Sequence, residues 1–337
     1  MYILRAHPAP ITAIDFTPSG TQLCSSDQLG WSVWWDLPTR RPICIWKSHE
    51  LSVNSTLCRD DLVYTHGREN KLKVWRLQLS PFFNQSPPNQ ASDPAQYQTP
   101  WLVHTQDINA LNFCSIAVDH DLFATPSTLS SEKIDIYRLD PFSRPLKGFH
   151  PDVIDLKLGI VMAIRLYSDY LVIGYESGHV AIFSGSVESP KLEFIEQLHK
   201  DALQSLTRID HFIYSSATDR RICRIELRTF SHIHTTVPRK GVATVHNLFN
   251  KIYTAGWDGV VRRFDMDLTP LGEFKDLRQV SCIALAEVSC SDATRLSENR
   301  LKQLPRAYLA VAGKDSRISL YPIDSESILP SMPVLIQ

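Results

Sequence analysis

The sequence predicts an all-β fold, a propeller of seven four-stranded blades whose ring is closed by the N-terminal strand. A group of three short strands recurs seven times along the 337 residues. The copies follow each other at intervals near 40 residues, and periods of about 40 to 45 residues are typical of repeats with four strands. The last copy is followed by only a short tail, so the beginning of the chain is left to supply its fourth strand.

The third strand of each copy carries an aromatic residue near its end, and this residue aligns the copies. Ile225 takes its place in the fifth copy. The other copies carry Trp35, Trp75, Tyr137, Phe183, Phe264 and Tyr321. The steps along this series are 40, 62, 46, 42, 39 and 57 residues, and the two long steps coincide with insertions.

The first and second strands of each copy are short apolar runs separated by Gly, Asn, Asp and Ser, a pattern that indicates strands joined by tight turns. First strands are predicted at residues 11–16, 53–58, 108–113, 161–166, 203–208, 242–247 and 280–285. Second strands are predicted at residues 21–27, 61–67, 121–127, 170–176, 211–217, 250–256 and 307–313.

A fourth, outermost strand is predicted in each interval, for example at residues 41–48 and 191–198. Only residues 324–337 follow the last third strand. We therefore predict that residues 1–5 form the outer strand of the seventh blade. This closure avoids the two unpaired strand edges of an open array, which would invite aggregation.

With these copies the chain resembles the WD40-repeat β-propellers. Residues 1–323 are predicted to form one such propeller, with residues 324–337 as a C-terminal tail. Insertions at about 78–100 and 287–306 interrupt the repeat. The first is rich in Pro, Asn, Gln and Ser, a composition that does not fold alone, and the second contains a stretch suited to a short amphipathic helix at residues 295–304. Both insertions are either surface loops or partner-docking segments.

In the WD40 family an acidic residue in the turn between the second and third strands commonly bonds to a histidine in the loop before the first strand, and a tryptophan extends this network. The resemblance implies that structural role for the turn acids Glu69, Asp219, Asp258 and Asp315.

Two histidines are placed to complete this network, His49 with Glu69 and His199 with Asp219, although Ile225 deprives the second pair of its indole. The acid position is occupied by Leu29, Ser131 and Ser177 in the first, third and fourth copies. No such pair is therefore expected in those three blades.

The residue directly before each turn acid is predicted to project from the propeller face that carries these turns. These partner-binding candidates are Arg68, Thr218, Trp257 and Lys314. Trp and Arg are the residue types that dominate interface hot spots. Trp257 is therefore either an anchor for a partner or a ring that covers a neighbouring loop.

Composition limits the function classes. The net charge of −1 argues against direct nucleic-acid binding, which is usually accompanied by a basic excess. The chain has no run of 18 apolar residues, which predicts a soluble, intracellular protein without a membrane span. The seven cysteines are scattered without a CxxC pair and are expected to be buried, so no metal site is predicted.

The sequence also predicts no catalytic residues and no cofactor site. The His and Asp residues recur at structural positions, whereas catalysis requires unlike groups that converge at one place. The chain contains no GxSxG, HExxH, phosphate-loop or kinase motif.

Three segments, "HGRENKLKVWRL", "AGWDGVVRRFD" and "VAGKDSRISLY", give a closer resemblance. With a chain little longer than the propeller, they are similar to the fungal ASTRA-associated protein 1 family, whose animal counterpart is the G-protein β-subunit-like WD protein. The resemblance implies a non-catalytic scaffold subunit of an ASTRA-type assembly. It also implies that this subunit acts together with a HEAT-repeat co-chaperone complex in the maturation of phosphatidylinositol 3-kinase-related kinases. A role in chromatin regulation is implied as well.

The partners implied are proteins, mainly large HEAT-repeat subunits, bound by a monomeric propeller in the nucleus and cytoplasm. Two other classes stay open at this point. One is another WD40 adaptor, such as a substrate receptor of a ubiquitin ligase. The other is an enzyme on a propeller frame, which the lack of a catalytic constellation disfavours.

Overall fold

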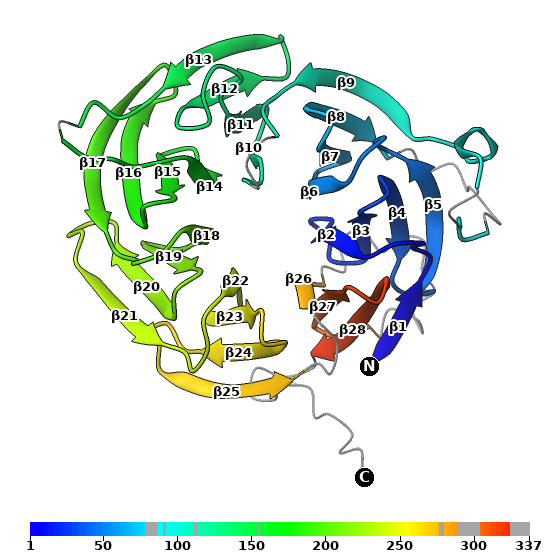
Figure 1. The fold of residues 1–337 in the computed structure, drawn as a ribbon. Helices are drawn as coiled ribbons and strands as arrows, with labels where there is room; N and C mark the ends of the chain where they lie inside the picture. The colour runs from blue at the N-terminus through cyan, green and yellow to red at the C-terminus, as the bar shows by residue number, and fades with distance from the viewer. Residues whose placement is uncertain are drawn as a thin grey trace.

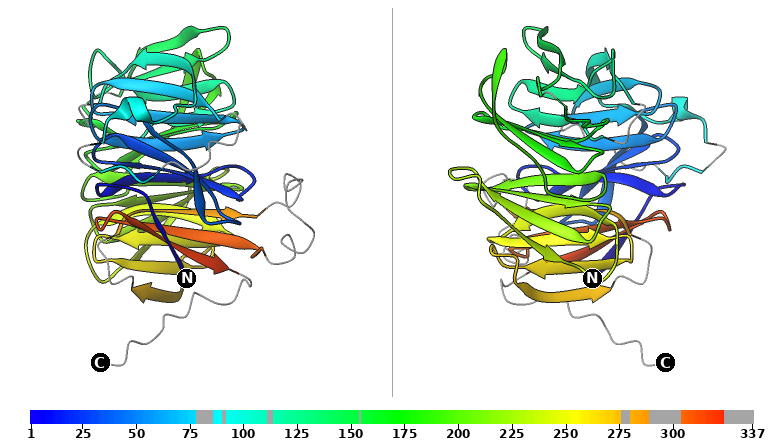
Figure 2. Two further views of the ribbon diagram at one scale, coloured as in Figure 1. Left: turned by 90° about the vertical axis from the view of Figure 1, so that its right-hand side faces the viewer. Right: turned by 60° about the vertical axis from the view of Figure 1, so that its left-hand side comes forward.

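The computed structural model describes residues 1–77, 86–89, 92–110, 114–153, 155–275, 280–288 and 304–323. Within these residues seven antiparallel four-stranded sheets stand around a common axis (Figure 1). The predicted seven-bladed propeller is thereby confirmed. Figure 2 shows the ring edge-on, with strands crossing its thickness, so the connecting loops gather on two opposite faces.

Every blade has the same order of strands from the axis outwards. The innermost strands are β2 (Ile11–Phe16), β6 (Val53–Arg59), β10 (Ala117–Asp119), β14 (Val161–Leu166), β18 (Leu203–Ile209), β22 (Val242–Leu248) and β26 (Val280–Glu287). The second strands are β3 (Gln22–Asp27), β7 (Leu62–Gly67), β11 (Leu122–Pro126), β15 (Tyr170–Tyr175), β19 (Phe212–Ala217), β23 (Lys251–Gly256) and β27 (Ala307–Gly313).

The third strands, which carry the aligning aromatic residues, are β4 (Trp31–Asp36), β8 (Lys71–Arg76), β12 (Ile134–Arg138), β16 (His179–Ser186), β20 (Arg221–Glu226), β24 (Val260–Phe264) and β28 (Arg317–Ile323). The outermost strands are β5 (Arg41–Lys47), β9 (Trp101–Asp107), β13 (Ser143–Phe149), β17 (Ser189–Gln197), β21 (His232–Thr236), β25 (Pro270–Lys275) and β1 (Tyr2–Arg5).

The ring closes through the N-terminal strand, as the sequence predicts. Strand β1 pairs antiparallel with β28, with Tyr2 opposite Leu320 and Arg5 opposite Arg317. Leu4 is 2% exposed and belongs to an apolar cluster that contains Trp35 of the first blade and Ile318 of the seventh. The closing strand therefore covers apolar surface from both blades that meet at the seam.

The third blade departs from the prediction at its innermost strand. Residues 108–113 were the predicted strand, but residues 108–110 form no strand and residues 111–113 lie outside the described residues; β10 (Ala117–Asp119) pairs with β11 as the innermost strand. The Asn70 backbone carbonyl accepts from the Ile108 N–H at 2.9 Å, and the Asn70 side chain accepts from the Ala110 N–H at 3.1 Å. Ile108 therefore takes the place that Ser48 has five residues before β6, where the Ser48 N–H donates to the Gly30 carbonyl at 3.0 Å, so residues 108–110 belong to the loop before the first strand.

The first insertion is anchored at its C-terminal end. After the short 3₁₀ helix η1 (Pro94–Gln96), the Tyr97 ring packs edge-on against Trp31, with their centroids 4.8 Å apart. The Cys44 thiol donates to the carbonyl of Gln98 at 3.4 Å. This part of the insertion therefore covers the first blade rather than standing free. Residues 295–303 of the helix expected in the second insertion, and the tail 324–337, lie outside the described residues.

The core lies between the blades, where the two faces of each sheet meet those of its neighbours. Cys24, Cys44 and Cys58 are buried with Trp34 and Trp46 between the first and second blades, where they pack as small apolar side chains. Burial raises the pKa of Cys44 to about 12, so its thiol stays protonated. No helix among the described residues is long and apolar enough to cross a membrane.

The closing strand offers a test of how far the ring depends on it. Leu4→Ala is expected to destabilise the protein by about 2 kcal/mol or more, because it opens a cavity at the seam. Ile3, on the same strand, is 38% exposed, and Ile3→Ala should cost less than about 1 kcal/mol. Thermal melting of the two variants checks this difference, and equal melting temperatures would contradict the role assigned to β1.

Candidate partner-binding face

One face of the propeller, named here the turn face, carries the turns between second and third strands together with the loops before the first strands. In five blades a backbone hydrogen bond joins the turn between the second and third strands to the loop before the first strand. The donor–acceptor pairs, at 2.8–3.0 Å, are Gln28–Pro10, Arg68–Ser52, Glu176–Ile160, Thr218–Ala202 and Trp257–Gly241. The turn face is therefore held at regular intervals by the main chain itself.

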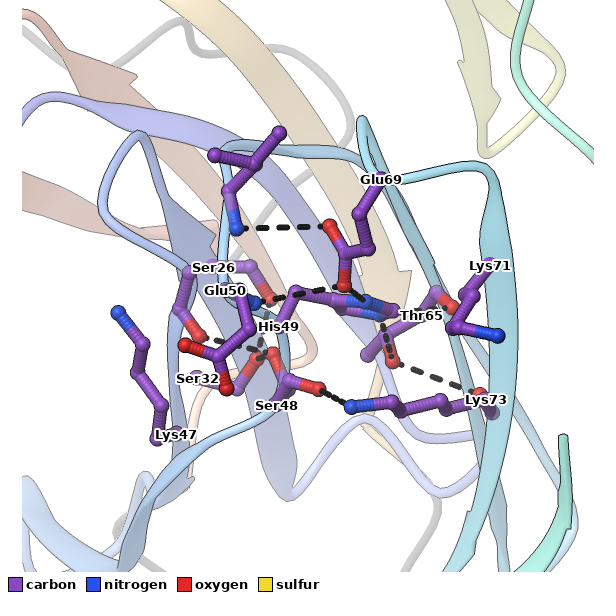
Figure 3. Close-up of polar contacts among 12 residues, drawn as sticks. Ser26, Ser32, Lys47, Ser48, His49, Glu50, Thr65, Glu69, Lys71 and Lys73 are labelled. Atoms are coloured by element: carbon purple, nitrogen blue, oxygen red, sulfur yellow. Dashed lines mark hydrogen bonds and ion pairs between the residues drawn. The ribbon is translucent and has the colours of Figure 1, made fainter. Parts of the chain in front are cut away.

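In the second blade a side-chain network reinforces this link (Figure 3). His49 is fully buried and lies between the Glu69 carboxylate, which accepts from Nδ1–H, and the Thr65 hydroxyl, which donates to Nε2 at 2.8 Å. The Trp75 indole N–H donates to the Thr65 oxygen at 2.8 Å. Both ring nitrogens of His49 thereby have partners, and the Thr65 hydroxyl joins the imidazole to the indole.

A buried chain of hydroxyl groups continues from this network into the first blade. Ser32 forms hydrogen bonds with Ser48, at 2.7 Å, and with Ser26, at 2.8 Å (Figure 3). Ser26 in turn lies 2.7 Å from the Thr56 hydroxyl on the innermost strand of the second blade. These contacts fix the loop that carries His49 to both blades.

The first blade contains a network of the same kind, contrary to the expectation from the sequence. Its acid is Asp27, two residues before Leu29, and its carboxylate lies 2.9 Å from the Nδ1 atom of His7. The Nε2 atom of His7 is 2.7 Å from the Ser25 hydroxyl, which also accepts from the Trp35 indole at 2.8 Å. Asp27 was missed as the acid of this blade because it is the last residue of strand β3 and does not lie in the turn that follows.

The fifth blade retains a shortened network. The His199 Nδ1 atom is 3.2 Å from the Asp219 carboxylate, and its Nε2 atom is 2.9 Å from the Ser215 hydroxyl. Ile225 stands where an indole would complete it. Asp219 also accepts from the backbone N–H groups of Lys200 and Arg221, at 2.9 and 2.8 Å.

The remaining two turn acids bind arginines instead of histidines. Asp258 forms a buried ion pair with Arg262, at 2.6 Å, and Arg262 also lies 3.2 Å from Glu273. Asp315 accepts from the backbone N–H of Arg317 at 3.3 Å. The four predicted acids thus occupy equivalent turns, but each turn is held by a different set of partners of its acid.

The environment of the turn acids sets their ionisation. Burial by itself would raise the pKa of Glu69, but the hydrogen bond from His49 and those from the backbone outweigh it and lower the pKa to about 2. The pKa of Asp219 is lowered in the same way, since hydrogen bonds from His199 and the backbone outweigh the effect of burial. Both acids are therefore carboxylates at neutral pH.

The order hydroxyl, imidazole, carboxylate in the second blade has the composition of a catalytic triad but not its accessibility. Thr65 is fully buried, and its hydroxyl is held between His49 and Trp75. A nucleophile must reach a substrate, so these residues serve to join the turn and the loop. Among the described residues no group of three or more His, Cys, Asp or Glu side chains is placed to hold a metal ion.

One face of the Trp257 ring packs against the protein, and the other face is open to solvent. Its ring lies over Gly241, where an added Cβ would come within 2.3 Å of ring atom Cε3, and Gly241 has a φ of +88°. Only glycine fits this position without strain. The Trp257 side chain is nevertheless 58% exposed, so one ring face covers a neighbouring loop while the other faces solvent.

The other partner-binding candidates differ in their positions. Thr218 lies next to Trp257, because its carbonyl accepts from the Gly241 N–H at 3.0 Å, and it is half-buried. Arg68 and Lys314 are exposed but belong to the second and seventh blades. The structure therefore joins Thr218 and Trp257 in one patch and places Arg68 and Lys314 elsewhere on the turn face.

The turn face also carries exposed leucines that sequence reasoning missed. Leu29, Leu51 and Leu129 are 37%, 52% and 69% exposed, in turns and loops of the first three blades. The signal available was a large apolar residue in a turn that is otherwise polar. Exposed apolar side chains gathered on one face are typical of protein-interaction surfaces.

The chain is similar to known proteins in sequence and in fold. The family model described as "ASTRA-associated protein 1" matches residues 1–307. The ASTRA-associated protein 1 of Yarrowia lipolytica is 28% identical over 95% of this chain and 93% of its own length. That of Verticillium alfalfae is 30% identical over 95% and 92%. A crystal structure of the computationally designed protein Ika8 shares the fold, with a TM-score of 0.62 and 15% identity over 95% of this chain and 98% of its own.

The Glu69 network predicts a specific pH dependence. The pKa of Glu69 is about 2 in the folded protein against an ordinary 4.5, so its stabilising contribution is complete above pH 4.5 and is lost as the pH falls towards 2. Glu69→Gln should therefore be less stable than wild type at pH 7, and this difference should shrink between pH 4.5 and 2. Glu50→Gln, an exposed neighbouring carboxylate, is the control. A stability difference that persists unchanged at low pH would contradict the mechanism.

Truncation of Trp257 and truncation of Trp75 are expected to have different effects on stability, because the first side chain is exposed and the second is buried. Trp257→Ala is expected to destabilise the protein by no more than about 1 kcal/mol, since most of the ring is exposed. Trp75 is 4% exposed, and Trp75→Ala should cost about 3 to 5 kcal/mol. Chemical denaturation measures both values. A Trp257 variant as unstable as the Trp75 variant would show that the ring acts as a core residue.

Proposed function

Because the chain belongs to the ASTRA-associated protein 1 family, we propose that it is a non-catalytic scaffold subunit of an ASTRA-type assembly. The observation that carries this proposal is the family match over residues 1–307, which reaches from the closing strand to the beginning of β27. The relatives are similar over nearly their whole length, so the likeness is that of complete propellers and not of one shared blade.

The finer part of the proposal concerns partners. We propose that the turn face binds large HEAT-repeat subunits of a co-chaperone complex that matures phosphatidylinositol 3-kinase-related kinases, in the nucleus and cytoplasm, and through them affects chromatin regulation. HEAT-repeat proteins present long concave surfaces made from stacked helices. A rigid face with an aromatic anchor and exposed leucines is suited to such a surface.

The chemistry of the described residues supports a binding role. Their histidine–acid pairs on the turn face are engaged in holding turns to loops, as the buried His49 and His199 show. Trp257, in contrast, has an open ring face that makes no contribution to the core. Truncation of such an anchor typically weakens binding by about 2 kcal/mol or more, or about thirtyfold.

Affinity purification of the tagged chain with mass spectrometry tests this function. Wild type is expected to recover HEAT-repeat proteins of the kinase-maturation machinery, and Trp257→Ala to recover much less of them. Trp101→Ala is the matched control, because Trp101 is 64% exposed but lies on the outer strand β9, away from the turn face. Recovery of cullin adaptors instead would identify a substrate receptor of a ubiquitin ligase and overturn the proposal.

A further inference from the structure

Four exposed basic residues lie in the loops and turn of the turn face that lead from the fifth blade to Trp257 in the sixth. They are Lys200, Arg220, Arg239 and Lys240. Lys200 and Arg220 flank the Asp219 network, while Arg239 and Lys240 precede Gly241, on which the indole rests. The residues come from three separate segments of the chain, so their proximity is a product of the fold.

Backbone contacts make this basic–aromatic patch continuous. The Gly241 N–H donates to the carbonyls of Thr218 and Asp219, at 3.0 and 3.3 Å, and the Trp257 N–H donates to the Gly241 carbonyl at 2.8 Å. One loop of the sixth blade is thereby fixed between the turns of two blades. The cations and the ring are presented from a rigid base and need little ordering on binding.

The carboxylates beside the patch neutralise only part of its charge. Asp201 pairs with Lys240 at 3.1 Å, Asp219 lies in the His199 network, and Asp258 pairs with Arg262. Among the described residues, no carboxylate lies within ion-pair distance of the side chains of Lys200, Arg220 or Arg239. Three exposed cations therefore remain without an ion pair in the described part of the chain, beside an indole with one open face, although Arg239 is near enough to Asp258 to help lower the pKa of that carboxyl.

We propose that this basic–aromatic patch binds an acidic segment of a partner protein, with carboxylates at the three cations and an apolar side chain against the open face of Trp257. The proposal rests on the scaffold function above and specifies the chemistry of the partner. Guanidinium groups bind carboxylates with directed hydrogen bonds. The aromatic anchor supplies the apolar contact that charge alone lacks.

A protein segment fits this patch better than a nucleic acid does. The chain has a net charge of −1 and lacks the basic excess of nucleic-acid-binding domains. The carboxylates of Asp201 and Asp258 lie beside the cations, where they would repel a continuous phosphate backbone. Acidic side chains on a peptide can meet the individual cations and avoid these positions.

Fluorescence anisotropy with the purified full chain tests the patch. The probe is a fluorescein-labelled peptide of aspartates and glutamates around a central phenylalanine, and single-stranded oligothymidylate is the competing ligand class. Wild type should bind the peptide more tightly than the oligonucleotide, with affinity that falls as salt is raised from about 0.05 to about 0.5 M. Trp257→Ala should weaken peptide binding by about thirtyfold.

Charge reversal supplies the decisive comparison. The double variant Arg220→Glu with Arg239→Glu should lose about tenfold or more in affinity for the peptide. The control is Arg41→Glu with Arg228→Glu, the same charge change at exposed arginines towards the opposite face, where Arg41 begins β5 and Arg228 lies in the turn between β20 and β21. Equal affinity of the two double variants, or tighter binding of oligothymidylate than of the peptide by wild type, would overturn the proposal.

The same double variants separate this proposal from the function on which it rests. If wild type recovers HEAT-repeat subunits from cells and Arg220→Glu with Arg239→Glu recovers as much as the control, the patch proposal fails while the scaffold function stands. If wild type recovers none of these subunits, the proposed function fails, and the peptide measurement still decides whether the patch selects acidic segments.

Discussion

The pairing of β1 with β28 is the contact on which the other features of the structure depend. Each blade has two apolar faces that only its neighbours can cover, so a break at one place exposes apolar surface on two blades. Leu4 fills that seam together with Trp35 and Ile318. Because no blade can stand free of its neighbours, the ring behaves as one unit, and the turns that it displays keep fixed positions relative to one another.

Within this ring, different side-chain pairs hold the turns and loops of the turn face in different blades. Turns and loops leave backbone groups that need partners, and the blades provide them with different side chains. His49 and Glu69 serve in one blade, Asp258 and Arg262 in another, and in the third Asn109 donates to the Ser127 carbonyl at 2.8 Å. The common requirement is a buried donor–acceptor pair of suitable length, which explains why the repeat keeps its geometry while its residues vary.

The sequence predicts the fold well because the repeat averages over seven copies, and an error in one copy does not change the architecture. It fails where an apolar run belongs to the loop before a strand and not to the strand itself. Ile108 is bound to Asn70 as Ser48 is bound to Gly30, so residues 108–110 lie in the loop before the first strand, and the innermost strand of the third blade is Ala117–Asp119. Asp27 was missed because it stands at the end of β3 and not in the turn. His7, like His49, lies four residues before the first strand, and a loop between β2 and β3 that is longer by two residues keeps the separation of 20 residues seen for His49 and Glu69. The positions of Trp257 and its turn follow from the repeat, whereas the basic residues around it come from distant segments and carry no pattern of their own.

The residues that define the repeat and the residues that a partner protein can contact are different sets. The residues that define the blades are enclosed by their own contacts, as the buried His199 and Ser215 illustrate, and so are unavailable to another protein. What a partner can recognise is the side chain that each turn presents beyond this framework. At Trp257 the two requirements meet, because the ring needs a glycine beneath it at position 241 and that same glycine ties two blades together. The anchor is therefore positioned by the closed ring itself, and its affinity for a partner depends on contacts between blades as much as on the exposed indole.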